Sequence, residues 1–231
     1  MSQIPKSGSN RTIWVSLHIL LADVHFELLN EGDVSMRIAR DSFANVGSGG
    51  HAARHILLVD RGTSARRLSN EMRVREAISA VLVSTPGLDA SIRQLPIISW
   101  KPQKNVSLDV AAFRAAALIV APHGAGLSNI LFAKEGTPVI EICYDSNGGR
   151  LKEMLCPAMY AAMAVNLNLP YWVVTGHGSY TSAIRCDLAQ LSAALQQAVA
   201  IIARGPQVPR RCGSRAADSR DEPEGVPDQA G

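Results

Sequence analysis

The feature that most constrains the fold is an alternation of short apolar runs with longer amphipathic segments. Such runs are typical of buried parallel strands, and the segments between them have the 3.6-residue period of helices. The apolar runs cover residues 55–60, 95–100, 118–121, 138–142 and 171–175. The helical segments cover residues 70–83, 108–117, 127–134, 150–167 and 188–204. This order predicts βαβ units and an α/β fold: a Rossmann-like parallel sheet with helices on both faces.

The two ends of the chain differ from this regular part. Residues 1–34 stay unassigned, since residues 13–30 fit a helix and a strand equally well, and residues 46–50 form a glycine-rich connection. From residue 205 to residue 231 the composition shifts to Pro, Arg, Asp, Glu and Gly, which predicts a disordered tail.

Composition narrows the class of protein. Hydrophobic residues make up 47% and charged residues 19% of 231 residues, which is typical of a globular chain that buries a core. The formal net charge of +3 is too mild to indicate a nucleic-acid partner. No apolar run is long enough to predict a membrane-spanning helix.

The four cysteines match no metal-binding spacing. They are Cys143, Cys156, Cys186 and Cys212. A disulfide between two of them is compatible with residence in an oxidising compartment, but the spacing does not require one. Buried free thiols are the preferred interpretation.

The most informative stretch is residues 118–129, where an apolar strand runs into Pro122-His123-Gly124-Ala125-Gly126 and then a short helix. The glycines permit positive φ and close approach of a ligand to the backbone. A helix start presents unpaired N–H groups and a partial positive charge, which together favour an anion. We therefore expect this turn, with His123 as a further donor, to bind the phosphates of a nucleotide-type ligand.

Two alternatives to this hypothesis remain. The turn is also compatible with a plain connection between strand and helix that binds nothing. A dinucleotide site is the other alternative, because Glu141 follows Gly124 by roughly the distance at which that fingerprint has its ribose-binding acid. However, Asn129 stands where the third glycine of the fingerprint is needed.

Two parts of the sequence resemble glycosyltransferase family 61. The first is the run from residue 113 to residue 142, with its His-Gly-Ala-Gly turn between an apolar strand and a short helix, and a following strand that carries Glu141. The second is the strand at residues 57–60 with Arg61, then Arg66-Arg67-Leu68 and Asn70-Glu71. A weaker match covers residues 160–171, and the resemblance as a whole spans residues 35–204.

The resemblance implies an inverting, metal-independent transferase with two Rossmann-like domains, the GT-B arrangement. It would transfer a sugar from a nucleoside diphosphate sugar, with uridine diphosphate expected, to a glycan or glycoprotein acceptor. Members usually reside in the Golgi or endoplasmic reticulum lumen behind a membrane anchor, which this chain does not display. Only 34 residues precede the resemblance, so we expect the donor-binding half of such an enzyme. The alternative is a nucleotide-sugar-binding module without transferase activity.

The resemblance also implies a set of donor-binding residues. They are Arg61, Arg66, Arg67, Asn70, His123, Gly124, Ala125, Gly126, Asn129 and Glu141. Forked guanidinium groups are suited to a diphosphate, although three arginines in one loop are also common on surfaces. Asn70 is equally compatible with a helix cap, and Glu141 with ribose binding or with a neighbouring helix N-terminus.

Neither a cofactor nor a metal is expected. The chain has no Asp-x-Asp pair of the kind that holds a metal–diphosphate bridge. No spacing selects a catalytic base, and His177 is interpreted as a histidine in a surface loop.

Overall fold

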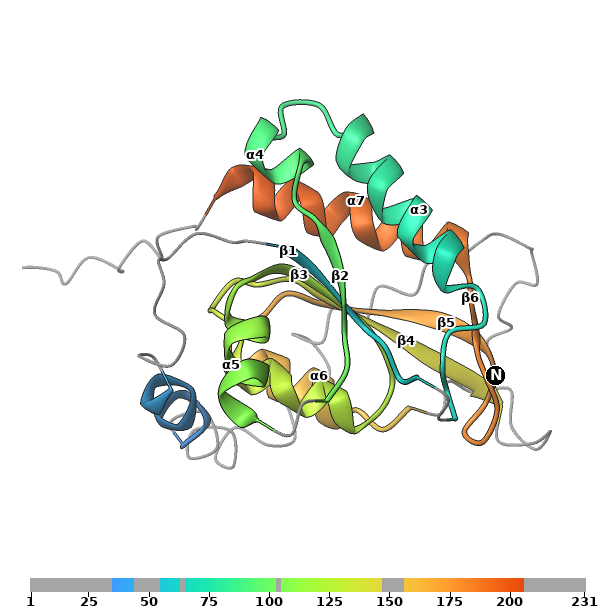
Figure 1. The fold of residues 1–231 in the computed structure, drawn as a ribbon, viewed down its shortest axis with the longest axis horizontal. Coiled ribbons are helices and arrows are strands. Elements are labelled where there is room, and N and C mark those ends of the chain that lie inside the picture. Colours follow the sequence, from blue (N-terminus) through green and yellow to red (C-terminus); the bar gives the residue numbers. More distant parts are fainter. Residues whose placement is uncertain (1–34, 44–54, 63–64, 103–104, 147–155, 206–231) are drawn as a thin grey trace, which may run out of the picture.

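The computed structural model describes residues 35–43, 55–62, 65–102, 105–146 and 156–205. A six-stranded sheet with the order β2-β1-β3-β4-β5-β6 forms its centre (Figure 1). The strands are β1 His55–Val59, β2 Ile97–Trp100, β3 Ala116–Pro122, β4 Val139–Ser146, β5 Tyr171–Ser179 and β6 Arg185–Cys186. Neighbouring strands are parallel except for β5 and β6, which are antiparallel. The predicted α/β class with a mostly parallel sheet is confirmed.

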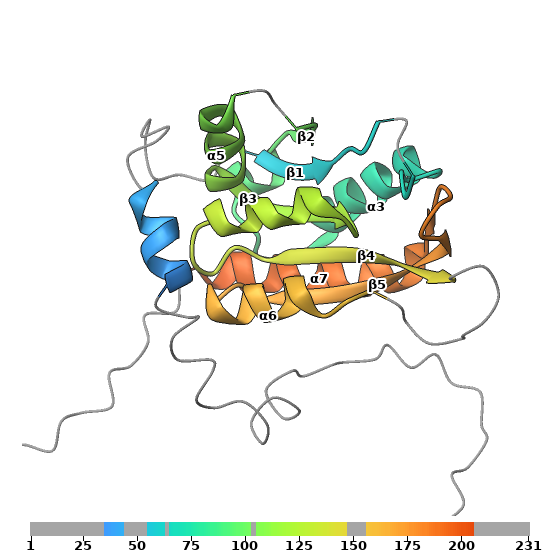
Figure 2. The same ribbon diagram turned by 90° about the horizontal axis from the view of Figure 1, so that it is seen from below.

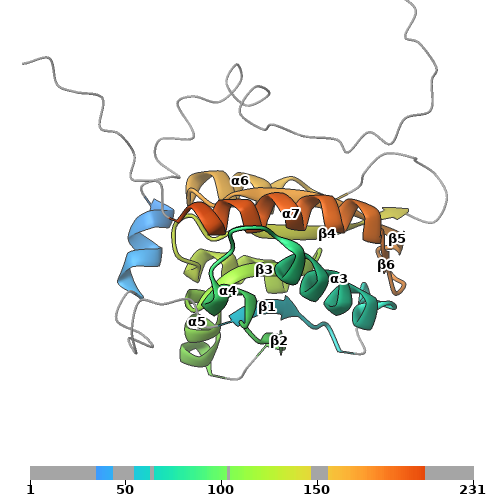
Figure 3. The same cartoon turned by 90° about the horizontal axis from the view of Figure 1, so that it is seen from above.

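Helices cover both faces of this sheet. They are α3 Glu71–Ser84, α4 Ala90–Arg93, α5 Val106–Arg114, η1 Ala125–Phe132, α6 Met159–Asn166 and α7 Leu188–Arg204, with a further helix over residues 35–42. Helices α3 and α7 lie on one face (Figure 3), whereas α5, η1 and α6 lie on the other (Figure 2). None of the helices in the described residues is long and apolar enough to cross a membrane.

The strands supply two cores because alternate side chains point to opposite faces. In β1, Ile56 and Leu58 pack with α3 and α7, whereas Leu57 and Val59 pack with α5 and η1. All five residues of β1 and all seven of β3 are buried. A strand buried on both faces needs a continuous apolar run. This is the pattern on which the prediction of buried parallel strands was based.

The strand order changes direction between β1 and β3. Strand β2 pairs with one edge of β1, and β3 pairs with the other. In open parallel sheets, ligands bind beyond the carboxyl ends of the strands at such a switch point. The residues that follow the two strands here are Asp60 and Arg61 after β1, and His123 and Gly124 after β3.

Several expected boundaries are wrong. The helix expected over residues 108–117 ends at Arg114, because Ala116 and Ala117 join the buried strand β3 despite the helix propensity of alanine. The helix expected over residues 150–167 begins only at Met159 in the described residues. The short helix α4 and the two-residue strand β6 were not predicted at all.

The segment after the glycine turn is a 3₁₀ helix, η1, which begins at Ala125 and not at Leu127 as predicted. The Asn129 side-chain Nδ2 donates to the Gly126 carbonyl over 3.1 Å. A bond from a side chain to a nearby carbonyl competes with the α-helical hydrogen bond at that carbonyl. Asn129 thus supports a tighter winding at the start of this segment.

The preferred interpretation of the cysteines as free thiols is wrong for two of them. Cys143 in β4 and Cys156 ahead of α6 form a disulfide, with Cα atoms 5.8 Å apart. The sequence gives no sign of this pairing, because it depends on α6 packing over the face of β4 that Cys143 shares with Glu141. Cys186 is free and buried, and Cys212 lies outside the described residues, as do residues 1–34, 46–50 and 206–231.

Candidate functional site

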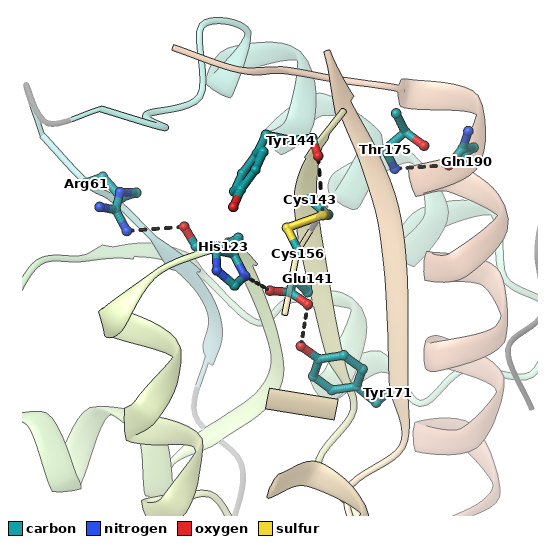
Figure 4. Close-up of a disulfide and its surroundings, with 9 residues drawn as sticks. All are labelled: Arg61, His123, Glu141, Cys143, Tyr144, Cys156, Tyr171, Thr175 and Gln190. Carbon is teal, nitrogen blue, oxygen red and sulfur yellow. Dashed lines mark hydrogen bonds and ion pairs between the residues drawn. A yellow bond between two sulfur atoms is a disulfide. The ribbon is translucent and has the colours of Figure 1, made fainter. Parts of the chain in front are cut away.

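Gly124 and Arg61 meet where strands β1 and β3 end. The Arg61 side chain lies directly against the α-carbon of Gly124, and a Cβ at Gly124 would be 1.6 Å from Arg61 Nη1. Gly124 also has φ 153°, a conformation that other residues rarely adopt. Glycine at this position leaves room for the guanidinium beside the turn, and Figure 4 shows Arg61 directed at the His123 carbonyl.

Backbone carbonyls hold the Arg61 guanidinium. Its Nε donates to the Ala65 carbonyl over 2.8 Å and its Nη1 to the His123 carbonyl over 3.3 Å. Burial, and then the neighbouring charge of Arg66, lower the pKa of Arg61 below its ordinary value. Nη2 has no partner among the residues that the structure describes, so the group keeps a donor for a ligand.

Arg66 is the second cation of the site. Its guanidinium carbon lies 4.3 Å from the centre of the Tyr180 ring. Its Nε is buried and has no hydrogen-bond partner within the described part of the chain. The residue has φ 64°, held by a bond from its backbone N–H to the Ser182 carbonyl over 2.7 Å.

Neither arginine has a carboxylate partner in residues 35–43, 55–62, 65–102, 105–146 and 156–205. The nearest acid in sequence, Asp60, pairs with Lys101 over 3.1 Å and accepts the Gly62 N–H. Two cations held close together without an acid between them leave an excess of positive charge, which favours binding of an anion.

A chain of buried hydrogen bonds lies beneath the turn. His123 Nδ1 and Glu141 Oε1 are 2.5 Å apart, and the Tyr171 hydroxyl donates to Glu141 Oε2 over 2.8 Å. His123 is 5% and Glu141 2% exposed, and burial followed by the nearby Glu141 raises the pKa of Tyr171 well above its ordinary value. The Tyr144 and Tyr160 rings pack against His123. The imidazole is thereby held in one orientation.

Four of the ten predicted site residues lie together around the end of β1 and the turn: Arg61, Arg66, His123 and Gly124. A fifth, Glu141, bonds His123 beneath them. Ala125 and Gly126 follow at the start of η1, where the first N–H groups of a helix have no partner within it. A Cβ at Gly126 would lie 3.2 Å from a Val59 methyl carbon and 3.3 Å from the Trp100 ring. A side chain at Gly126 would therefore crowd Val59 and Trp100.

Glu141 and the other three predicted residues have different surroundings. The Arg67 side chain is exposed, and its backbone carbonyl accepts a hydrogen bond from the Ile184 N–H. Both polar atoms of the Asn70 side chain bond the backbone of Cys186, each over 3.0 Å, and they do not cap α3. Asn129 bonds Gly126, and both oxygens of Glu141 are engaged as described above.

One group of side chains has metal-ligand chemistry. Ligand atoms of His123, Glu141 and Cys156 lie within 4.8 Å of one another. The Cys156 sulfur is bonded to Cys143, however, and a metal needs the thiolate. In the disulfide form this group therefore offers only a histidine and a carboxylate that already bond each other.

A second histidine–carboxylate pair was missed. His177 Nδ1 lies 2.7 Å from Asp145 Oδ2. Strand β5 continues to Ser179 and β4 to Ser146, so His177 is a strand residue and the prediction of a surface loop was wrong. The pairing depends on the register between β4 and β5, which no spacing in the sequence reports.

Comparison with known proteins assigns the chain to a family. Residues 15–140, more than half of the chain, match the family described as Glycosyltransferase 61. The matched region contains both arginines and the glycine turn of the site. No curated protein matches the chain.

Proposed function

This chain belongs to glycosyltransferase family 61, and from that premise we propose that it takes a sugar from a nucleoside diphosphate sugar bound at the carboxyl ends of β1 and β3. Family membership implies glycosyltransferase activity in general. The proposal adds the class of donor, with uridine diphosphate as the nucleotide, and the place where its diphosphate lies.

The observation that carries the proposal is the pair of guanidinium groups at the switch point. Arg61 lies against Gly124, and the buried Nε of Arg66 has no partner among the described residues. A buried donor that bonds nothing is costly, and an anion that accepts from it removes that cost. A diphosphate has the charge and the spread of acceptor oxygens to bond both arginines and the N–H groups at the start of η1.

The same contacts suit the chemistry of transfer. An acceptor oxygen attacks the anomeric carbon, and the bond from that carbon to the diphosphate breaks, with inversion. Negative charge then builds up on the departing diphosphate. Cations fixed by backbone carbonyls, such as Arg61, stabilise that charge without having to reorganise.

Glu141 takes a different role in this proposal from ribose binding. Its two oxygens bond His123 and Tyr171, so a ribose hydroxyl would have to displace one of them. We assign Glu141 to positioning His123 and, through it, the glycine turn. Arg67 and Asn129 stay at the periphery of the proposed donor site, and Asn70 connects α3 to β6.

The acceptor and the compartment are also proposals. A glycan or glycoprotein acceptor and a Golgi or endoplasmic reticulum lumen follow from the family. The Cys143–Cys156 disulfide supports the lumen, because such bonds persist in oxidising compartments. The second domain of a GT-B arrangement would supply the acceptor surface.

The proposal is tested by isothermal titration of uridine diphosphate into the parent protein, Arg61→Gln and Arg73→Gln. Arg73 is a matched control, since it is an exposed arginine of α3 that pairs with Glu76. Loss of a charge-assisted bond is expected to weaken binding by Arg61→Gln about tenfold to hundredfold. Arg73→Gln should bind as the parent does, and EDTA should change none of the three affinities.

Equal binding by Arg61→Gln and the parent would place the diphosphate elsewhere. Loss of binding in EDTA would show that a metal ion, and not the two arginines alone, neutralises the ligand.

A further inference from the structure

Asp145 and His177 form a second polar centre at the carboxyl ends of β4 and β5. We propose that His177, positioned by Asp145, is the general base that removes the proton from the acceptor hydroxyl. This inference rests on the proposed function and supplies the one chemical role that the donor site lacks.

The pair has the geometry of an oriented base. The His177 Nδ1–H donates to Asp145 Oδ2 over 2.7 Å, which leaves the lone pair of the neutral ring on Nε2. The backbone N–H of Gly178 donates to Asp145 Oδ1 over 3.0 Å, so the carboxylate is fixed from a second side. The His177 side chain is 57% exposed, and an incoming hydroxyl can reach it.

The carboxylate of this pair stays ionised. Burial alone would raise the pKa of Asp145, but the hydrogen bonds from Gly178 and His177 outweigh burial and hold that pKa below its ordinary value. An ionised Asp145 stabilises the imidazolium that forms once His177 has accepted a proton.

Aromatic rings connect this pair to the donor site. Tyr144 precedes Asp145, and its ring centre lies 5.6 Å from that of His123 and 5.9 Å from that of Tyr180. Tyr180, three residues after His177, also holds the Arg66 guanidinium. The pair therefore lies at the same edge of the sheet as the two arginines, on the side of β4 and β5.

The other described histidines do not suit this role. His55 is buried at the start of β1, at the opposite end of that strand, with its ring beside the Ala112 carbonyl. His123 is 5% exposed and is committed to Glu141. Of the other acids at this edge, Asp60 pairs with Lys101 and Glu141 is buried.

The acceptor oxygen forms a bond to the anomeric carbon while its proton passes to His177 Nε2. The bond between the anomeric carbon and the diphosphate oxygen breaks, and the diphosphate leaves with the electron pair, held by Arg61 and Arg66. Water takes the place of the acceptor in slow hydrolysis of the donor.

The test measures release of uridine diphosphate from UDP-xylose and from UDP-N-acetylglucosamine, each with and without xylotetraose. His177→Asn retains a donor toward Asp145 but accepts no proton, and the release rate is expected to fall by about 10²-fold or more. Asp145→Asn should cause a smaller loss. The control is Arg185→Gln, which removes the charge directly across the β5–β6 ladder from His177 and should keep the parent rate.

Two further readouts separate a base from a residue needed only for folding. Affinity for uridine diphosphate, measured by titration, should be the same in His177→Asn and the parent. Added imidazole should restore release in His177→Ala, because the vacated position is open to solvent.

A His177→Asn rate equal to the parent rate, or no rescue by imidazole, would overturn the assignment of the base. A parent that binds uridine diphosphate but releases none from either donor would also overturn it, and the donor site would stand. A parent that does not bind uridine diphosphate would overturn both proposals.

Discussion

Glu141 is a carboxylate in the middle of a buried sheet, and its two bonds explain how the sheet tolerates it. A buried charge without partners is very costly, and here His123 and Tyr171 each occupy one oxygen. The two partners come from different strands, so a single side chain connects the end of β3 to the start of β5. Through its bond to His123, Glu141 helps to hold the residue at which the glycine turn begins.

Removal of the Tyr171 hydroxyl tests this dependence. Tyr171→Phe leaves Glu141 Oε2 without its donor, and the free energy of unfolding is expected to fall by about 1–3 kcal/mol. Urea denaturation measures the change. In the control Tyr180→Phe, where the ring is 52% exposed, we expect a change within about 0.5 kcal/mol. A Tyr171→Phe protein as stable as the parent would mean that the Tyr171–Glu141 bond stabilises nothing.

At the scale of elements, the disulfide attaches the start of α6 to β4. Its two cysteines are 13 residues apart in sequence. Closing a loop of this length removes conformational freedom mainly from the unfolded chain. Helix α6 carries Tyr160, which packs against His123, so the bond also stabilises one wall of the buried pair.

Reduction of this disulfide should destabilise the protein measurably. Dithiothreitol is expected to lower the free energy of unfolding by about 3 kcal/mol, the value for loops of this size. Urea denaturation with and without the reductant measures the effect. The Cys143→Ala/Cys156→Ala protein serves as the control, because the reductant should not change its stability. No effect of dithiothreitol on the parent would contradict the account of the bond.

Sequence patterns predicted the elements whose burial is uniform along their length. Helix α7 was predicted with its observed ends, because one face is continuously apolar and Asp187 caps its first turn. The patterns failed where a partner distant in sequence decides the structure. Ala116 and Ala117 belong to β3 because of their neighbours in β1, and β6 exists because β5 continues past its predicted end.

The same division between local pattern and distant partner applies to the candidate site. Gly124 was expected in the donor site from the strand–glycine–helix pattern and Arg61 from the family resemblance, and the structure brings these two residues into contact. The bonds of Glu141, Asn70 and His177 were not predictable, since each depends on a pairing across the sheet or between separate elements.

At the scale of the whole molecule, the Cys186 thiol and the Tyr171 hydroxyl should set an alkaline limit to stability, because the pKa of each is raised in the folded protein. Burial raises the pKa of the Cys186 thiol from 9.0 to about 12, and the pKa of Tyr171 is raised further. Above pH 9 the unfolded chain loses the thiol proton while the folded protein keeps it. The stabilisation is therefore complete below pH 9 and is lost as the pH rises toward 12.

The expected slope is about 1.4 kcal/mol per pH unit for each group that titrates only in the unfolded chain. Urea denaturation at intervals from pH 8 to pH 11 measures it. Cys186→Ala should show a shallower decline above pH 9 than the parent. Identical slopes in the two proteins would show that Cys186 does not contribute to the limit.

The central claim is that a nucleoside diphosphate binds where β1 and β3 end, and nuclear magnetic resonance tests it most directly. Uridine diphosphate would be titrated into ¹⁵N-labelled protein while the backbone amide shifts are followed. The account predicts saturable shifts at Arg61, Gly124, Ala125 and Gly126, and no change on the far face at Ile78 of α3 and Leu195 of α7. Saturable shifts confined to the α3–α7 face, or none anywhere, would contradict it.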